Sequence, residues 1–459
     1  MPSRIRLAIL TALTASACHV ARGRPSPDAN LIAITHATVI TGTGAPPLRD
    51  VTVLIRGRRI VAVDRDTAIA ASATRIDGTG KFVLPGLWDM HVHLVLEGRG
   101  ALPLYVRSGV TGVRDMGGQF ETIRRFRIEI ARGNVVGPRI LAAGPQLESP
   151  TSWTGILQSA AKPESARAQI DRVVVPDVAT ARRVVDSLAA LGVDFIKSRS
   201  YASVDVYWEI ANRTHRHRLP LAGHAPFELV IDPVAFADSG NESLEHWFYP
   251  GNLTGLPDST YQRIVAAYVR HGTALLPTLG AWRQHRFTYD SLRSMLQRAL
   301  RDGAAGSRVA SSLIEHWNTE LAQRRTERNG SPSTAEQLVG WNRVLSEFAR
   351  DVGRLHAAGV PVLPGSDLPF ARFPGEALQD ELIYLVRETG LTPQQVIEGA
   401  TRESVKWLHL QDSLGTVTAG KIADLVILDA DPLADIENVR RVYGVVLAGR
   451  WMAISAIGN

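Results

Sequence analysis

From about residue 84 to residue 365, the chain repeats one pattern: a short apolar stretch with strand character, followed by a helical stretch. The expected strands lie at residues 112–114, 139–142, 195–197, 221–223, 243–245, 274–278 and 362–365. Chains that alternate strand and helix in this way form parallel sheets covered by helices. About eight such units close into a (β/α)8 barrel, so the pattern predicts an α/β protein with a TIM barrel over residues 84–410.

The two ends of the chain have a different character. Residues 31–83 contain short β-branched stretches interrupted by glycines such as Gly42 and Gly57, which are strand and turn signals. Residues 411–459 return to strand character near the C-terminus. We therefore expect one small β-sandwich domain that is assembled from both ends of the chain.

One part of the barrel region is longer than a single barrel helix requires. Residues 301–359 are rich in helix-forming residues, with a plausible start at Ser331-Pro332-Ser333 and a stop at Gly359. This stretch predicts a helical insertion, and a lid or cap over the barrel is one interpretation of it.

Composition excludes several classes of protein. A chain of 459 residues with 45% hydrophobic and 21% charged residues is neither disordered nor fibrous. Its 51 Lys and Arg against 45 Asp and Glu give a net charge of +6, without basic runs, so nucleic acid is not an expected partner. With 1 Cys, neither an intramolecular disulfide nor a cysteine zinc site can form. Any metal must be held by His, carboxylate or Lys side chains.

The first residues are typical of an export signal. Arg4 and Arg6 precede an apolar stretch at residues 7–13, which is too short to span a membrane, and small residues lead to Cys18. The segment Ala15-Ser-Ala-Cys18 resembles a bacterial lipoprotein box, although Ala15 stands where Leu is usual. We expect a signal peptide at residues 1–17, lipidation of Cys18, a polar tether at residues 18–30 and a periplasmic, membrane-anchored protein. The alternative is a simple cleaved signal peptide with an incidental Cys.

Histidines and other ligand-type residues gather at the ends of the predicted strands. His91 and His93 follow an apolar stretch, and residues i and i+2 of a strand face the same side, so both imidazoles can meet one metal. An H-x-H pair alone is a weak signal, because His215-Arg216-His217 has the same spacing in a basic stretch that we expect to be exposed to solvent. The first pair differs because ligand-type residues also stand at four later strand ends, where a barrel builds its active site. They are Lys197, His224, His246 and Asp367.

With these residues in place, the chain resembles the metal-dependent amidohydrolase superfamily, close to its imidazolonepropionase-like and prolidase-like group. The motifs that carry the resemblance are Pro85-Gly-Leu-Trp-Asp-Met-His-Val-His93 and the closing stretches at residues 415–417 and 420–426. The resemblance implies a small-molecule hydrolase with two divalent metal ions, most favourably zinc. It implies that the first ion takes His91, His93 and Asp367, and that the second takes His224 and His246.

The resemblance also gives Lys197 a particular role. It implies that Lys197 bridges both ions after its amine captures carbon dioxide as a carbamate, because a protonated ammonium with an ordinary pKa of about 10.4 cannot bind a cation. A hydroxide between the ions would attack an amide, lactam, imide or related ester, and Asp367 would pass the proton to the leaving nitrogen. The alternative for Lys197 is an interior Lys paired with Asp367 or another carboxylate, with one metal present.

Two other functional classes stay open at this point. A mononuclear deaminase acting on a heterocycle carries, in the resembling families, a Glu three residues after the fifth-strand His, but here Phe227 has that place and Glu228 follows it. A catalytically inactive scaffold is the other class, and the intact set of ligand residues argues against it. A homo-oligomer is compatible with the sequence, which does not decide it.

Substrate-binding residues are harder to derive. Tyr201 could donate a hydrogen bond to the developing oxyanion, and Arg199 could hold a substrate carboxylate, although both could equally be loop structure. Four residues after the seventh strand could line the pocket: Thr278, Trp282, Arg283 and His285. Prolidase-like relatives cleave dipeptides and N-acyl amino acids, so the resemblance implies a small substrate with a carboxylate, or a cyclic amide.

Overall fold

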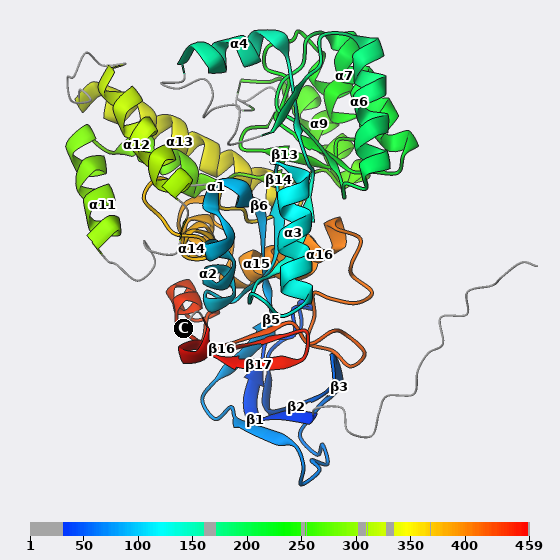
Figure 1. Ribbon diagram of the computed structural model, residues 1–459, viewed down its shortest axis with the longest axis vertical. Helices are drawn as coiled ribbons and strands as arrows, with labels where there is room; N and C mark the ends of the chain where they lie inside the picture. Colours follow the sequence, from blue (N-terminus) through cyan, green and yellow to red (C-terminus); the bar gives the residue numbers. More distant parts are fainter. Residues whose placement is uncertain are drawn as a thin grey trace, which may run out of the picture.

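The structure is a computed structural model that describes residues 31–159, 171–248, 253, 255–301, 309, 311–326, 335–367 and 369–457. A sheet region lies at one end of the molecule, and a larger region of strands and helices lies above it (Figure 1). The predicted signal peptide, Cys18 and tether lie outside the described residues. Within the described ranges, every helix is too short or too polar to cross a membrane.

Both ends of the chain contribute to one sheet. Among the described residues its strands run in the order β17-β16-β15-β5-β1-β2-β3, with β4 paired to β1. Their bounds are β1 Leu31–Val39, β2 Leu48–Arg56, β3 Arg59–Asp64, β4 Thr74–Asp77, β5 Phe82–Pro85, β15 Leu425–Leu428, β16 Val442–Leu447 and β17 Arg450–Ala453. The antiparallel pairing of β5 with β15 joins the two ends. Because all eight strands share one hydrogen-bonded ladder, the predicted sandwich is not confirmed.

This sheet has its own apolar core. Strands β1, β2 and β15 alternate in side-chain direction, and their inward residues, such as Ile34, Val53 and Ile427, are fully buried together. The core of the small sheet is therefore separate from the large core that supports the rest of the chain.

The remaining strands form two parallel sheets, as the strand and helix alternation predicts. The first has the order β6-β7-β8, with bounds Leu87–Val92, Val110–Asp115 and Arg139–Ala142. The second has the order β10-β9-β11-β12-β13-β14, with bounds Arg172–Val174, Gln146–Glu148, Ile196–Ser198, Leu221–Gly223, Ser243–Glu245 and Ala274–Leu276. Every strand pair in both sheets is parallel.

The two parallel sheets approach each other at two seams rather than forming one continuous barrel sheet. At one seam, residues 361–367 lie between β14 and β6: Leu363 N donates to Leu275 O, and Met90 N donates to Pro364 O. The strand predicted at residues 362–365 is reduced to a single bridge between Leu275 and Val362, because Pro364 has no N–H to donate to a ladder. At the other seam, Asp194 N donates to Ala142 O.

Helices lie outside these strands (Figure 1). The longer ones are α3 Phe120–Ala131, α6 Val178–Leu191, α7 Val204–Arg216, α9 Asp258–His271 and α14 Glu376–Thr389. Shorter ones are α1 Leu94–Glu97, α2 Leu102–Arg107, α4 Pro150–Ser159, α8 Pro233–Ala237, α10 Leu279–Trp282, α15 Pro393–Glu398 and α16 Ser404–Trp407. Helix α6 shows the local logic: Asp177 caps its first turn by accepting from Thr180 N, and Ala181, Val185 and Leu188 form its buried face.

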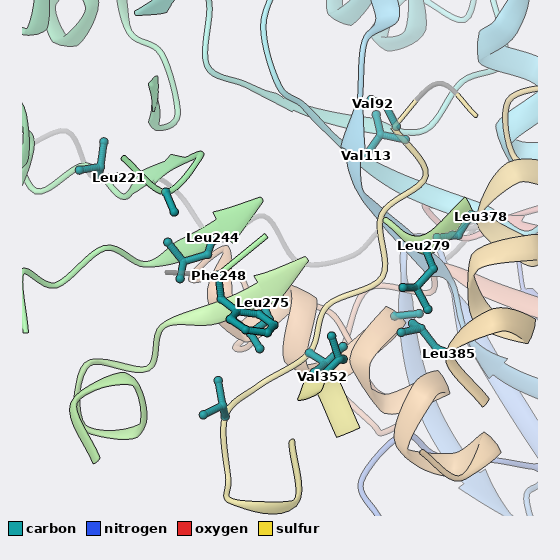
Figure 2. Packing of buried hydrophobic residues seen from close by; sticks show 14 of the residues in the cluster. Val92, Val113, Leu221, Leu244, Phe248, Leu275, Leu279, Val352, Leu378 and Leu385 are labelled. Atoms are coloured by element: carbon teal, nitrogen blue, oxygen red, sulfur yellow. The ribbon is translucent and has the colours of Figure 1, made fainter. Parts of the chain in front are cut away.

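The main core fixes the strand ends in place. Val92 and Val113 from the first sheet, and Leu244 and Leu275 from the second, belong to one buried cluster (Figure 2). Helix α14 packs onto the same cluster through residues such as Leu378. Close packing of this kind leaves little freedom for the residues that directly follow each strand.

The helix-rich stretch is helical in the structure. It follows α11 (Tyr289–Arg301) and contains α12 (Ser311–Thr326) and α13 (Ala335–Ala357). The predicted start at residues 331–333 lies outside the described residues, whereas α13 ends two residues before Gly359, whose φ is +96°. Helices α11 and α12 share a small core with Phe373, and α13 packs against α14.

Candidate metal centre

The six predicted ligand residues stand at the carboxyl ends of parallel strands, where a barrel builds its active site. In chain order they are His91 in β6, His93 directly after it, Lys197 in β11, His224 after β12, His246 after β13 and Asp367 at the end of the seam segment. Neighbouring parallel strands end at one edge, so residues far apart in sequence meet there. All of the six except Asp367 and His224 are less than a tenth exposed.

Asp367 is the centre of this group. Its carboxylate oxygens lie 3.3 Å from Nε2 of His91, 3.4 Å from Nε2 of His93 and 3.6 Å from Nδ1 of His246. Ligand atoms of His91, His246 and Asp367 all lie within 4.8 Å of one another, as they must to share a metal ion. These contacts hold the pKa of Asp367 well below its ordinary value, although burial alone would raise it. The group is anionic and faced by imidazole nitrogens, which suits a divalent cation.

His224 and Lys197 complete the cluster on its other side. The rings of His224 and His246 are edge to face, with centroids 4.9 Å apart. Burial, followed by the charges of Lys197 and His246, lowers the pKa of His224 well below its ordinary value, so the imidazole is neutral and can bind a metal. Burial likewise lowers the pKa of Lys197 to about 8. Its Nζ is buried and has no hydrogen-bond partner within the described ranges.

Three residues around the site have left-handed backbone conformations. The φ angles are +68° at His246, +47° at Thr278 and +46° at Asp367. Such conformations are costly for residues with a β-carbon, and most costly for a β-branched residue such as Thr. His246 follows β13, Thr278 follows β14 and Asp367 ends the seam segment, so the strain falls where the cluster is assembled. It turns the His246 and Asp367 side chains toward each other.

A buried carboxylate that sequence reasoning missed orients the first His. Glu245 accepts a hydrogen bond of 2.8 Å from Nδ1 of His91, and it also accepts from Arg114 at 2.7 Å and Ser243 at 2.6 Å. Burial alone would raise the pKa of Glu245, but Arg114 and His91 hold it below its ordinary value. A proton on Nδ1 leaves Nε2 of His91 as the nitrogen that faces Asp367. In the sequence, the only indication of this role was the polar-apolar-polar pattern of residues 243–245 within a strand that was expected to be buried.

Two further residues hold parts of the cluster in place through hydrogen bonds. Thr278, expected as a pocket residue, hydrogen-bonds to Nδ1 of His246 through its hydroxyl at 2.7 Å. Asp89 is fully buried and accepts from the backbone N–H groups of His91 and Ser366. It therefore ties β6 to the seam segment that carries Asp367.

The predicted substrate residues are placed differently. Arg199 pairs with Glu148 at 3.3 Å and hydrogen-bonds to Ser152, so its guanidinium is engaged beside the site. Tyr201 is 3% exposed and packs edge to face on Tyr207. Its backbone N–H donates to Glu228, the residue next to the place that a deaminase acid would occupy. The substrate roles of Arg199 and Tyr201 stay predictions.

Aromatic rings continue outward from His246. The Trp282 ring lies 5.9 Å from the His246 ring and 5.8 Å from that of His285, which stacks on Trp341 of α13 at 4.1 Å. Arg283 instead pairs with Glu388. The two histidines of the weak motif face carboxylates elsewhere: His215 faces Glu242, and His217 pairs with Asp186.

Comparison with known proteins agrees with this geometry. The model of the amidohydrolase family matches residues 82–452, which is most of the chain. The chain belongs to the amidohydrolase family. It is therefore a hydrolase that acts on carbon–nitrogen bonds, and the resemblance read from the motifs is confirmed.

Relatives of this amidohydrolase span nearly its whole length. Imidazolonepropionase of Aromatoleum aromaticum is 25% identical over 403 residues, covering 85% of this chain and 88% of the relative. A candidate prolidase structure from Bifidobacterium longum is 25% identical with a TM-score of 0.67, covering 92% and 95% of the two chains. A Xaa-Pro dipeptidase structure with bound methionine is 20% identical with a TM-score of 0.66, covering 92% and 100%, and supports the fold. These likenesses give the amidohydrolase a TIM-barrel-type fold.

Proposed function

We propose that this amidohydrolase is a binuclear metal enzyme that hydrolyses an amide-like bond in a small substrate, with zinc as the favoured metal. The observation that carries the proposal is Lys197, whose buried Nζ has no hydrogen-bond partner in the described part of the chain. A buried ammonium without a partner is costly. If the amine adds to carbon dioxide and loses a proton, the resulting carbamate becomes an anionic oxygen ligand among the histidines.

Different residues of the site have different roles in the proposed hydrolysis. When bound, the metal ions would supply a water of lowered pKa and polarise the carbonyl group under attack. Asp367 is placed to accept the proton of the attacking water and to deliver it to the leaving nitrogen, as the C–O bond forms and the C–N bond breaks. Glu245 and Thr278 keep the rings of His91 and His246 oriented throughout.

For the substrate, we propose a dipeptide, an N-acyl amino acid or a cyclic amide. The names of the similar proteins support these classes, since they include imidazolonepropionases and prolidase-like structures. Arg199 stands beside the cluster, where its guanidinium could exchange part of its pairing with Glu148 for a substrate carboxylate. Tyr201 is buried against Tyr207, and its hydroxyl is the proposed hydrogen-bond donor to the oxyanion.

Metal analysis combined with hydrolysis assays tests the proposal. The purified protein is analysed for metal content and then assayed against dipeptides, N-acyl amino acids, cyclic imides and lactones. We expect about two ions per chain and cleavage of one of the amide classes. One ion with ammonia released from a heterocycle would favour a mononuclear deaminase. A protein that binds no metal and cleaves nothing would be a scaffold.

The mononuclear class has one observation in its favour. His91, His246 and Asp367 already form a compact group that could hold a single ion. With one ion present, Lys197 would serve as an interior cation rather than as a ligand. Replacing Lys197 with Ala separates the two cases, because it should remove one ion and most of the activity from a binuclear enzyme. In that variant, acetate in the buffer should restore part of the activity by replacing the carbamate, whereas a mononuclear enzyme would not respond to acetate.

For the architecture, we propose that the parallel strands constitute one barrel domain at residues 84–410 and that residues 31–83 and 411–459 constitute a second, β-rich domain of sandwich type. The backbone hydrogen bonds at both seams and the separate apolar core of the terminal sheet support this division.

For localisation, we propose export to the periplasm and a lipid anchor on Cys18. Support comes from the sequence pattern of residues 1–18. Wild-type protein should fractionate with membranes and release into detergent, and Cys18→Ser should yield a soluble or unprocessed chain. Wild-type protein found wholly in the soluble periplasmic fraction would contradict the anchor.

A further inference from the structure

A cavity of about 350 Å³ lies where η2 (Arg283–Arg286), α11, α14 and η4 (Ile436–Arg440) approach one another. None of the six candidate metal ligands lines it. Its size is near the lower end of the range of ligand pockets, which is about 300–1,000 Å³. The cavity is thus a separate site with room for a small molecule.

The charged groups that line the cavity are unbalanced. Four guanidinium groups and two carboxylates face it: Arg283, Arg372, Arg387, Arg440, Asp380 and Glu437. The carboxylates are shared, since Asp380 pairs with both Arg372 and Arg440, and Glu437 pairs with both Arg387 and Arg440. Arg283 also pairs with Glu388, which lies outside the cavity and pairs with Arg286 as well. Adding Glu388 and Arg286 to the count adds one negative and one positive charge, so the excess stays at two positive charges.

The rest of the cavity wall is largely apolar. Phe287, Met295, Phe370 and Ile383 line it, and Tyr384 lies under the Arg283 guanidinium at 4.1 Å from the ring centroid. The wall is therefore suited to a molecule that has both an anionic group and an apolar body.

We propose that this cavity binds a small organic carboxylate with an apolar body, independently of the metal centre. A guanidinium presents its N–H groups in a fork that matches the two oxygens of a carboxylate. The surplus of two guanidinium groups gives such an anion a partner without breaking every existing ion pair. The apolar wall favours an aromatic or branched body over an inorganic anion.

The cavity also adjoins the segments that build the metal centre. Pro369 and Phe370 line it and follow Asp367 closely in the chain, while Gly280 lines it two residues after Thr278. A bound carboxylate would thus pack against both loops that hold Asp367 and the partner of His246. We expect binding there to stabilise the metal-loaded enzyme.

Calorimetric titration of the metal-loaded protein with benzoate tests the proposal. Benzyl alcohol, which lacks the charge, and sulfate, which lacks the apolar body, are titrated in parallel. We expect benzoate to bind at least tenfold more tightly than either. We expect Arg387→Gln to weaken benzoate at least tenfold and Arg182→Gln to leave it unchanged. Arg387 and Arg182 are matched, since both side chains are 58% exposed and pair with a Glu, but only Arg387 lines the cavity.

Benzoate could instead bind at the metal centre, and a variant of that centre distinguishes the two sites. Benzoate bound to the metal ions would be lost in Asp367→Asn and kept in Arg387→Gln, and that result would overturn the proposal. If Arg387→Gln fails to fold, Met295→Trp replaces it, because the larger side chain should fill the cavity and block benzoate. Equal binding of sulfate and benzoate, or no binding of benzoate to the wild type, would also overturn the proposal.

Discussion

At the scale of single residues, the candidate centre depends on groups that do not themselves face a metal. Glu245 is the clearest case, because this one buried carboxylate accepts hydrogen bonds from Nδ1 of His91, the guanidinium of Arg114 and the hydroxyl of Ser243. Removing its charge affects two things at once. It frees the His91 ring to turn, and it removes the ion-pair partner of the buried Arg114 guanidinium.

We therefore expect Glu245→Gln to weaken metal binding about 10- to 100-fold, the usual effect of losing a residue that orients a metal-binding His. Stability should also fall, by up to about 3–5 kcal/mol, because the Arg114 charge is uncompensated. Chelator competition measures the first effect and thermal unfolding the second. Glu209→Gln, which removes a surface partner of Arg182, is the control and should change neither quantity appreciably. Unchanged metal affinity in Glu245→Gln would show that Glu245 is not needed to orient the His91 ring for metal binding.

His215 gives a pH-dependent prediction away from the site. Its Nε2 lies 3.1 Å from the carbonyl oxygen of Gly240 and 3.5 Å from Oε1 of Glu242. The hydrogen bond with Glu242 raises the pKa of His215 above its ordinary value of 6.5. The folded state therefore holds this proton more tightly than the unfolded state does. The stabilisation is complete below about pH 6.5 and is lost as the pH rises through the higher folded-state pKa.

Wild type should accordingly be more stable than His215→Gln at pH 5.5, and this advantage should shrink by pH 8.5. The effect should be small, at most about 0.5 kcal/mol, since a third of the side chain is exposed and solvent screens the pair. Denaturant unfolding at the two pH values measures it. Arg216→Gln, a neighbouring change that leaves His215 in place, should show a constant difference, and a constant difference for His215→Gln would contradict the assignment.

At the scale of elements, the strand ends are held together by close backbone approach. Gly223 ends β12 beside β11, and a β-carbon at this position would lie 2.2 Å from the carbonyl oxygen of Ser198. Backbone cannot yield as a flexible side chain can. A side chain at Gly223 would push apart the two strands that present Lys197 and His224.

Gly223→Ala should thus lower stability by about 1–3 kcal/mol, as overpacking does, and should reduce the metal content. Gly340→Ala is the matched control: Gly340 lies in α13, and beyond its own helix backbone no described atom lies within 4 Å of the added carbon. It should stabilise the protein by about 0.5–1 kcal/mol through helix propensity. Unfolding free energy and metal analysis of both variants make the comparison. Normal metal content in Gly223→Ala would mean that β11 and β12 tolerate separation.

The elements also mark how far the sequence alone could be interpreted. Strands β8, β12 and β13 begin and end where their short apolar stretches predict. The predicted strand at residues 274–278 is shorter in the structure, because Pro277 cannot donate to a ladder and Thr278 has a positive φ. Strands β9 and β10 were not predicted; β9 follows β8 without a helix between them, which departs from the strand and helix alternation on which the prediction rests.

The site divides in the same way. The ligand-type residues could be predicted because each follows a strand, and strand ends converge in a barrel. The roles of Glu245 and Arg114 could not, because they arise from contacts between residues more than 100 positions apart. The arginine-lined cavity has the same origin, since α14 and η4 contribute its charges from distant parts of the chain.

At the scale of the whole molecule, the metal centre links the two parallel sheets, which in the described part of the chain are otherwise joined by few backbone hydrogen bonds. The two parallel sheets meet at seams, and His91 and His246 come from different sheets while Asp367 is the last residue of the seam segment between them. Ions held by these residues would bind the folded state and not the unfolded chain, because the ligands are assembled only by folding. Metal should therefore contribute to the stability of the entire barrel.

We expect removal of metal by a chelator to lower the melting temperature, by an amount that grows with the logarithm of the ratio of free metal to its Kd. At 100 times Kd the loss is about 2.7 kcal/mol for one site. The melting temperature should rise again with added zinc, and Arg182→Gln should respond as the wild type does. Asp367→Asn should respond weakly to the chelator, since its main site is already impaired. An identical melting temperature with and without metal would mean that the seam is held by protein contacts alone, and that the centre serves chemistry without contributing to the fold.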